Sequence, residues 1–292
     1  MKNMAKMHLL AAPLIALAMV ACGGGHNSVA PDTVETAQEW WSGVEESNAN
    51  SFVKIYGIQD REGEQAVDLF RGSYDDALLG ALVDSGQTAF ASAFNVYLVQ
   101  GNSGNGDSLT HTILFDAGIG PQAGGKLLER MREKGVESTA VEAVCLTHLH
   151  FDHLGWLLDE EGNVTFTNAD LYLSDKELAS ARADERWQQM MAAYGERVKT
   201  FADGDTICYG LVRTMVLPGH TPGHTVYVVG PCLIVGDLLH AQDLQLEHPD
   251  FCARYDADPA AAVEVRKRIY DLARRSGRYL CGAHCYERFI EL

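Results

Sequence analysis

The sequence predicts an α/β protein, a sandwich of two strand-rich halves with helices on the outside. Short runs that alternate in polarity or are wholly apolar recur in both halves of the chain, and segments of helical periodicity lie between them. No polar linker divides the middle of the chain. A length of 292 residues, 47% apolar and 22% charged, suffices for one large domain.

The first half is predicted to begin with a strand and a hairpin, followed by a helix and a buried strand. The hairpin has a Gly- and Asn-rich turn at residues 101–107. The helix places Leu127, Leu128 and Met131 on one face. In order, the predicted elements are strands Phe52–Ile58, Asn95–Val99 and Thr112–Phe115, helix Lys126–Lys134 and strand Val141–Leu146.

The second half repeats this plan and closes with a helix rich in arginine. Its predicted elements are a strand at Asp170–Leu173, a helical region at Lys176–Tyr194, strands near Ile207 and at Val212–Leu217, Val226–Val229 and Leu233–Val235, and a helix at Pro259–Arg275. Because the two halves have similar content, their sheets are expected to pack together and to share a site.

The N-terminal residues predict export from a bacterial cytoplasm. Lys2 and Lys6 precede an apolar stretch, residues 9–20, that has the length of a signal-peptide core but is short for a membrane span. The stretch ends at Cys22 in a pattern that resembles a lipoprotein processing site, and ordinary cleavage near Ala16-Leu17-Ala18 is the alternative. We expect a signal peptide at 1–22, a tether at 23–50 and one domain at 51–292, periplasmic or membrane-anchored through lipidated Cys22.

The net charge limits the kinds of binding partner, and the cysteines bear on disulfides and metal ligands. The formal net charge of -17 would repel phosphate backbones, so the sequence predicts no nucleic-acid partner and favours a small-molecule ligand. Six cysteines follow Cys22; export would allow disulfides, but the spacing indicates no pairing and matches no zinc motif. Cys281 and Cys285 flank His284, where buried thiols are expected and a soft metal ligand is the alternative.

The segment Thr147–His153 carries the strongest chemical signal in the chain. It holds His148, His150, Asp152 and His153, three imidazoles and a carboxylate within six residues. The first two histidines can point the same way from an extended strand end, and a turn after Phe151 can bring Asp152 and His153 to a second ion. Imidazole with carboxylate suits zinc, with iron or manganese as alternatives. The segment therefore predicts half of a two-metal site.

Three further ligand-type residues follow predicted strands. His220 lies in the Gly- and Pro-rich turn 218–225, which can hold an imidazole rigidly. Asp237 follows the apolar run Leu233–Val235, and His284 follows Tyr279-Leu280-Cys281. Each alone is typical of a turn histidine or a capping aspartate, but together they can complete the site.

The whole pattern, from about Phe52 to His284, resembles the metallo-β-lactamase-fold hydrolases. The resemblance implies a four-layer αββα sandwich and two divalent metal ions, with zinc the expected metal. Carried over position by position, one ion would be held by His148, His150 and His220, the other by Asp152, His153 and His284, and Asp237 would bridge them.

Asp237 and the residues after it resemble one branch of these hydrolases. True β-lactamases of this fold generally lack the bridging aspartate, whereas residues 236–240, 248–251 and 256–259 are similar to methyl parathion hydrolases and quorum-quenching lactonases. This implies a small lactone, ester or related carbonyl or phosphoryl substrate. The chain departs from those relatives after His284, where it lacks their Pro-rich residues and further strand.

The expected reaction needs no side-chain nucleophile, because two ions can lower the pKa of a water between them enough to supply hydroxide. The absence of a Gly-x-Ser-x-Gly motif agrees with this. Asp152 is the predicted catalytic residue, serving as ligand and proton handler. Around it we expect Asp116 and His224 to hold ligands through hydrogen bonds, His240 to fix a neighbouring loop, and Phe90, Phe151 and Trp156 to line the substrate pocket.

Three other functions fit the same residues. One is β-lactamase-like amide hydrolysis. A second is a mononuclear iron enzyme resembling persulfide dioxygenases, which share the histidine motif. The third is a surface lipoprotein that binds a metal or ligand without turnover.

Overall fold

The computed structural model describes residues 32–37, 52–70, 76–102, 109–181 and 185–292. The predicted signal peptide, the predicted lipidation site Cys22 and most of the predicted tether lie outside these residues. Within them, no helix has both the length and the apolar character needed to cross a membrane.

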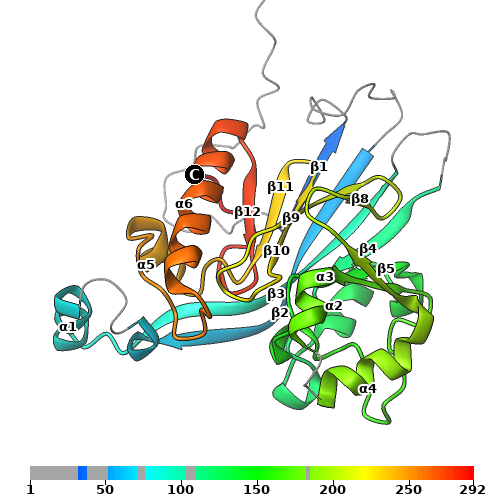
Figure 1. Ribbon diagram of the computed structural model, residues 1–292, viewed down its shortest axis with the longest axis horizontal. Helices are drawn as coiled ribbons and strands as arrows, with labels where there is room; N and C mark the ends of the chain where they lie inside the picture. Colours follow the sequence, from blue (N-terminus) through cyan, green and yellow to red (C-terminus); the bar gives the residue numbers. More distant parts are fainter. Residues whose placement is uncertain (1–31, 38–51, 71–75, 103–108, 182–184) are drawn as a thin grey trace, which may run out of the picture.

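The first sheet has seven strands that lie in chain order, β1 to β7 (Figure 1). They are β1 (Thr33–Ala37), β2 (Phe52–Ala66), β3 (Ala89–Asn102), β4 (His111–Phe115), β5 (Ala143–Cys145), β6 (Asp170–Ser174) and β7 (Val198–Phe201). Pairing is antiparallel from β1 to β4 and parallel from β4 to β7. Because β1 pairs with β2, this part of the predicted tether is a sheet strand.

The second sheet has five strands in the order β12-β11-β10-β9-β8. They are β8 (Thr206–Ile207), β9 (Val212–Val216), β10 (Thr225–Val229), β11 (Cys232–Gly236) and β12 (Tyr279–Gly282). Only β11 and β12 pair in parallel, which places their carboxyl ends at the same edge.

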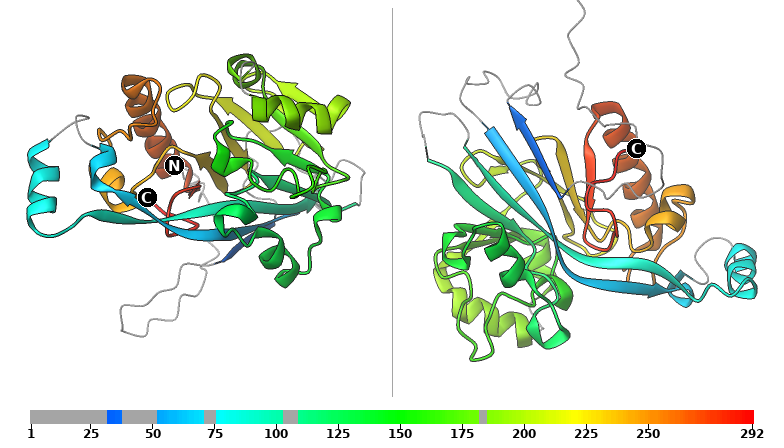
Figure 2. Two further views of the ribbon diagram at one scale, coloured as in Figure 1. Left: turned by 90° about the horizontal axis from the view of Figure 1, so that it is seen from below. Right: turned by 180° about the vertical axis from the view of Figure 1, so that it is seen from behind.

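Helices cover the outer face of each sheet, so the layers run helix, sheet, sheet, helix (Figures 1 and 2). The helices are α1 (Asp76–Asp84), α2 (Leu127–Glu133), α3 (Asp175–Ser180), α4 (Glu185–Tyr194), α5 (Gln242–Glu247) and α6 (Pro259–Ser276). Five single-turn 3-10 helices join them: η1 (Val67–Phe70), η2 (Pro121–Ala123), η3 (Ser138–Ala140), η4 (Phe151–His153) and η5 (Gly195–Arg197). The predicted four-layer α/β sandwich is confirmed.

Three apolar clusters hold these layers together. Between the sheets, Ile55, Tyr97 and Phe115 of the first sheet pack with Val212 and Tyr227 of the second. A further cluster lies beneath α2 to α4, and another lies beneath α6. Every residue of β4 and of β11 is buried, as expected for central strands covered on both faces.

Helix α6 shows how local sequence sets an element's ends. Asp258 caps its first turn by accepting a hydrogen bond from the Ala261 N–H at 3.1 Å, and Pro259 begins the helix. Gly277 ends it in the left-handed conformation, with φ of 60°. The observed end at Ser276 lies one residue beyond the predicted one.

The main differences from the predicted elements are in length and in short elements. Strand β2 does not end at Ile58 but continues to Ala66, paired with β3, and the two strands run out as an arm that carries α1 (Figures 1 and 2). The predicted helical region Lys176–Tyr194 is two helices, α3 and α4. Helices α1 and α5 and strand β7 were not predicted.

Candidate metal centre

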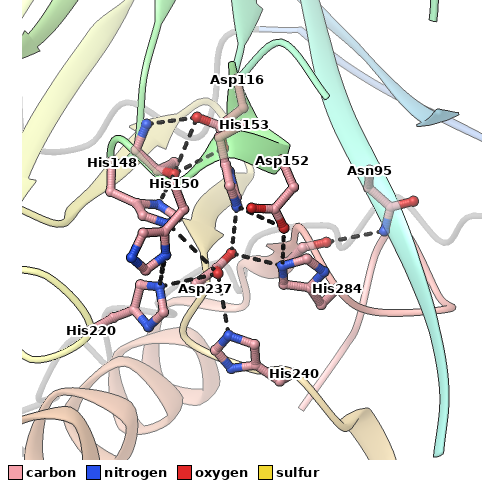
Figure 3. Close-up of polar contacts among 12 residues, drawn as sticks. Asn95, Asp116, His148, His150, Asp152, His153, His220, Asp237, His240 and His284 are labelled. Carbon is pink, nitrogen blue, oxygen red and sulfur yellow. Dashed lines mark hydrogen bonds and ion pairs between the residues drawn. The ribbon is translucent and has the colours of Figure 1, made fainter. Parts of the chain in front are cut away.

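All seven predicted ligand residues meet in one place, close to the ends of strands from both sheets (Figure 3). His148, His150, Asp152 and His153 follow β5, and the 3-10 turn η4 redirects the last two. The other three residues come from the second sheet: His220 from the β9–β10 turn, Asp237 from the end of β11 and His284 from just after β12.

One group of donor atoms comprises His148, His150, His220 and Asp237. His220 Nε2 lies 2.9 Å from His150 Nδ1 and 3.2 Å from His148 Nε2. The same nitrogen lies 3.2 Å from Asp237 Oδ2. Three imidazole nitrogens and a carboxylate oxygen therefore converge on one point.

The second group comprises Asp152, His153 and His284 and meets the other oxygen of Asp237. His153 Nε2 lies 2.9 Å and His284 Nε2 3.2 Å from Asp237 Oδ1. Asp152 Oδ2 lies 3.3 Å from His284 Nε2. Asp237 thus directs one oxygen to each group.

The donors fit divalent metal ions. His153 Nε2 and Asp237 Oδ1 are buried and have no hydrogen-bond partner, although they face each other. Buried polar atoms in that state call for an explanation, and an ion between them supplies one. The imidazole and carboxylate set is the one that zinc prefers.

The ring orientation of the second group's histidines is fixed by acceptors on their outer sides. His153 Nδ1 donates to Asp116 Oδ2 at 2.8 Å, and Asp116 Oδ1 also accepts the Thr147 N–H at 2.7 Å. His284 Nδ1 donates to the Ala93 carbonyl at 3.1 Å. Both rings therefore present Nε2 to the centre. Asp116 has the predicted role, and its φ of 61° shows that its backbone is held in a conformation uncommon for aspartate.

His220 is oriented in the same way by a residue that the sequence did not identify. Its Nδ1 donates to Asp256 Oδ1 at 2.9 Å. Asp256 is buried, and its other oxygen lies 3.8 Å from Arg266, a fully buried arginine of α6. Asp256 belongs to the segment 256–259 that carries the resemblance, but its role was not predicted, because it lies 36 positions from its histidine along the chain. Arg266 lies on a helix and was not singled out.

Strand β3 supports the loop of His284 across the sheets. Asn95 Nδ2 donates to the carbonyls of Gly282, at 3.1 Å, and Cys285, at 2.6 Å (Figure 3). The Asn95 N–H donates to the Ala283 carbonyl at 2.8 Å. Beyond this loop the chain turns back so that Ile290 bridges to Leu280. Sequence reasoning missed Asn95 because nothing distinguishes it within an alternating strand.

His224 and His240 both contact Asp237. The Asp237 N–H lies 3.3 Å from His224 Nε2, which agrees with the predicted supporting role. His240 Nε2 lies 3.2 Å from Asp237 Oδ2, and its ring stacks on His284 with centroids 5.2 Å apart. His240 was expected to fix a loop, and it also belongs to a third group of potential donors, with Asp237 and His284.

The site mixes low and high pKa values. Burial opposes the charged form of His220 and His284, yet the Asp237 carboxylate outweighs it and raises their pKa to about 9 and about 10. For Asp152, burial raises the pKa but the neighbouring His153 and His284 outweigh it and lower it to about 2. Burial, and then His220, lower the pKa of His150 to about 4.

A cavity of about 270 Å³ opens onto the second group. Its lining residues are Glu64, Gln65, Phe94, His150, Phe151, Asp152, Asp237, Tyr255 and His284. Phe151 is 61% exposed and stands between this cavity and another of about 670 Å³, which extends toward α3 and α4. The prediction that Phe151 borders the pocket agrees with this.

The other two predicted pocket residues lie elsewhere. Phe90 is buried in a cluster with Phe70 and Leu79 near α1. Trp156 Nε1 donates to the buried carboxylate of Asp60 at 3.1 Å, and its ring borders a separate surface cavity. Both assignments were wrong, because an aromatic residue near a motif in sequence is more often part of the core.

The six cysteines after Cys22 are buried free thiols. The sulfurs of Cys145 and Cys208 lie 3.5 Å apart. Cys281 and Cys285 belong to none of the potential metal-holding groups among the described residues, as expected for buried thiols.

The sequence profile of the metallo-β-lactamase superfamily matches residues 93–273. This chain belongs to the metallo-β-lactamase superfamily. The resemblance inferred from its motifs is thereby confirmed.

Two solved structures illustrate what this chain is similar to. A hydrolase called AbOPH is 24% identical, with a TM-score of 0.69 over 82% of this chain and 89% of its own. AidC, a dizinc quorum-quenching lactonase, is 21% identical, with a TM-score of 0.67 over 82% of this chain and 94% of its own. At these identities the structures support the common fold.

Curated relatives match over shorter segments. The N-acyl homoserine lactonase AiiA of Bacillus thuringiensis subsp. kurstaki is 23% identical over 168 residues, 56% of this chain and 63% of the relative. BaeB of Bacillus velezensis, a probable polyketide biosynthesis zinc-dependent hydrolase, is 29% identical over 120 residues, 40% of this chain and 46% of the relative. The matched segments thus span less than two thirds of either relative.

Proposed function

We propose that this member of the metallo-β-lactamase superfamily is a metal-dependent hydrolase with two zinc ions, acting on a small lactone, ester or related carbonyl or phosphoryl substrate. The observation that carries the proposal is the division of Asp237 between two groups of histidines, with Oδ2 facing His220 and Oδ1 facing His153. A protein that held a single ion would not need a buried carboxylate turned to both groups.

Two divalent ions in these groups would supply hydroxide near neutral pH and would polarise the bond to be broken. The chain's own contribution centres on Asp152. This residue lines the cavity of about 270 Å³ and contacts His284. Its pKa of about 2 keeps the carboxylate charged at neutral pH, so it can orient a water and accept a proton from it.

The cavity favours a compact, uncharged substrate. Phe94, Phe151 and Tyr255 give it aromatic walls, and Phe94 lies edge-on to His284 with centroids 5.2 Å apart. Glu64 lies at the same cavity, and the chain carries a formal charge of -17, so an anionic substrate would be repelled. The lactonase relatives AiiA and AidC support lactones as the first class to test.

Metal analysis combined with a substrate screen tests the proposal. We expect about two zinc ions per chain. Hydrolysis is expected within a panel of acyl-homoserine lactones, aryl esters, thioesters, phosphotriesters and β-lactams. Activity should be lost in Asp237→Asn and His153→Ala. One metal ion per chain at saturation, or full activity in both variants, would contradict it.

A further inference from the structure

Glu177, on the first turn of α3, is a buried carboxylate that belongs to neither ligand group. Its own N–H donates to Ser174 Oγ at 3.0 Å, the N-terminal cap of the helix. The cap fixes the helix start, and the side chain is then directed away from the sheet toward the metal-binding loops. Within a predicted helical region, nothing in the sequence marks this position.

The carboxylate accepts hydrogen bonds from both chain segments that supply the three-histidine group. Oε1 accepts the N–H of Leu149, which lies between His148 and His150, at 3.1 Å. Oε2 accepts the Thr221 hydroxyl at 2.8 Å and the Gly223 N–H at 2.9 Å, in the turn that carries His220. One side chain therefore joins the loop after β5 to the β9–β10 turn.

The helix start and the β9–β10 turn also touch directly. Ser174 Oγ donates to the Gly223 carbonyl at 2.8 Å. A Cβ added at Gly223 would lie 2.1 Å from the Glu177 backbone nitrogen, so only glycine permits this approach. The turn is therefore packed directly against the start of α3.

The other ligand group is held by different residues. Asp116 orients His153, and the Ala93 carbonyl orients His284. The three donors to Glu177 are neutral and are bound to a carboxylate that is 3% exposed, so removing that carboxylate would leave buried donors unsatisfied on the three-histidine side.

We propose that Glu177 is a positioning residue that sets the spacing of His148, His150 and His220, and thereby the affinity of the three-histidine group for its metal ion. This inference rests on the proposed two-metal function. It assigns to Glu177 no contact with substrate or metal.

The test is zinc affinity of the full chain, measured by competition with a chromophoric chelator. In Glu177→Gln, which keeps the side chain's size, we expect one of two zinc ions to bind about 10–100-fold more weakly and the other to bind unchanged. Asp60→Asn is a matched control. Its buried carboxylate also accepts from neutral donors, Ile119 N, Gly120 N, Leu127 N and Trp156 Nε1, away from the three-histidine group.

A double variant separates positioning from general destabilisation. In His220→Ala, which lacks a ligand of the three-histidine group, adding Glu177→Gln should leave the affinity of the remaining ion unchanged. Thr221→Val, which removes one donor and keeps the carboxylate, should weaken the same single ion by up to about tenfold. If Glu177→Gln does not fold, the zinc affinity of Thr221→Val tests the same proposal.

Equal weakening of both ions, an equal loss in Asp60→Asn, or unchanged affinity in both Glu177→Gln and Thr221→Val would overturn the role of Glu177. These outcomes leave the two-metal proposal intact. A wild-type chain that binds only one ion would overturn the two-metal proposal itself, before any variant is compared.

Discussion

Asp237 differs from the other ligand residues because its carboxylate lies close to five histidines at once. Its two oxygens lie within 3.6 Å of His148, His153, His220, His240 and His284. Burial raises its pKa, but these histidines outweigh burial and hold the pKa well below the usual value. A carboxylate that stays charged in a buried site is suited to hold two cations.

Asp152 can be tested by a substitution that keeps its shape. Asp152→Asn keeps one oxygen near His284 but cannot accept a proton, so we expect kcat to fall about 10²–10⁴-fold. Steady-state kinetics on the best substrate from the screen would measure this, with zinc content checked in parallel. A zinc-loaded variant with kcat within a few-fold of wild type would show that Asp152 does not handle the proton.

Phe151 and Phe90 allow a substitution in the pocket to be compared with a substitution in the core. Phe151 is 61% exposed, so Phe151→Ala should change KM while leaving the unfolding free energy nearly unchanged. Phe90 is 7% exposed and lies edge-on to Phe70, so Phe90→Ala should lower the unfolding free energy by about 3–5 kcal/mol. Denaturant unfolding and steady-state kinetics on both variants check this. If Phe90→Ala changed KM and left the unfolding free energy unchanged, Phe90 would belong to the pocket after all.

Zinc binding should release protons at neutral pH. In the metal-free protein the pKa of His220 is about 9 and that of His284 about 10, so both are protonated at pH 7 and must lose a proton to ligate. Burial lowers the pKa of the ligand His153, but Asp237 and Asp116 outweigh it and raise that pKa as well. Calorimetry in buffers of different ionisation enthalpy should therefore show release of about two to three protons at pH 7 and zinc affinity that increases with pH. Binding without proton release would contradict these pKa values.

The same shifts give the metal-free protein a defined pH dependence of stability. Since both pKa values are raised above the unfolded value of 6.5, their contribution is present in full below pH 6.5. It is lost as the pH rises through about 9 and 10. Urea unfolding of the zinc-free chain should therefore show stability falling above neutral pH.

At the scale of elements, the sequence indicated which strands end at the site but not how those ends are held. The segment after β5 could be predicted because four ligand-type residues lie within it, and those after β11 and β12 because each follows an apolar run. The roles of Asn95, Glu177 and Asp256 could not be predicted, because each residue acts on another at least 28 positions away along the chain. Long-range hydrogen bonds of this kind become visible only in the folded chain.

The short elements α5 and β7 were not predicted, for a related reason. Helix α5 has six residues, too few for a periodic pattern, and β7 has four residues with two exposed side chains. Both are stabilised by neighbours: Gln245 of α5, for example, accepts the N–H groups of His240 and Ala241 at 2.6 and 3.0 Å. Tertiary contacts rather than intrinsic propensity define them.

Asn95 tests whether β3 supports the His284 loop. Asn95→Ala would leave the Gly282 and Cys285 carbonyls without this donor, and we expect an unfolding free energy lower by about 1–3 kcal/mol together with weaker binding of one zinc ion. Asn168→Ala is the control, because Asn168 makes a single exposed bond to the Thr139 carbonyl and should change stability by no more than about 0.5 kcal/mol. If Asn95→Ala and Asn168→Ala changed stability and zinc binding equally, Asn95 would not support the His284 loop.

At the scale of the whole molecule, the candidate metal centre lies where the two sheets meet, and each sheet supplies part of both ligand groups. The first sheet contributes the segment after β5, and the second contributes His220, Asp237 and His284. Bound ions would therefore connect the two halves of the sandwich. The predicted sharing of one site between two strand-rich halves is what the fold shows.

Removal of metal should therefore destabilise the entire domain. Dialysis against a chelator is expected to lower the thermal midpoint of unfolding, and added zinc should raise it again in a concentration-dependent way. For one site, zinc at 100 times its dissociation constant should raise the free energy of unfolding by about 2.7 kcal/mol. Differential scanning calorimetry measures this. An unchanged midpoint at saturating zinc would mean that the ions do not bind the folded state preferentially.

The central claim is that Asp237 bridges two metal ions, and anomalous X-ray diffraction at the zinc edge tests it most directly. We expect two peaks per chain, one among His148, His150 and His220 and the other among Asp152, His153 and His284, with one oxygen of Asp237 directed at each. A single peak at saturating zinc, or two peaks with Asp237 in contact with only one, would contradict it.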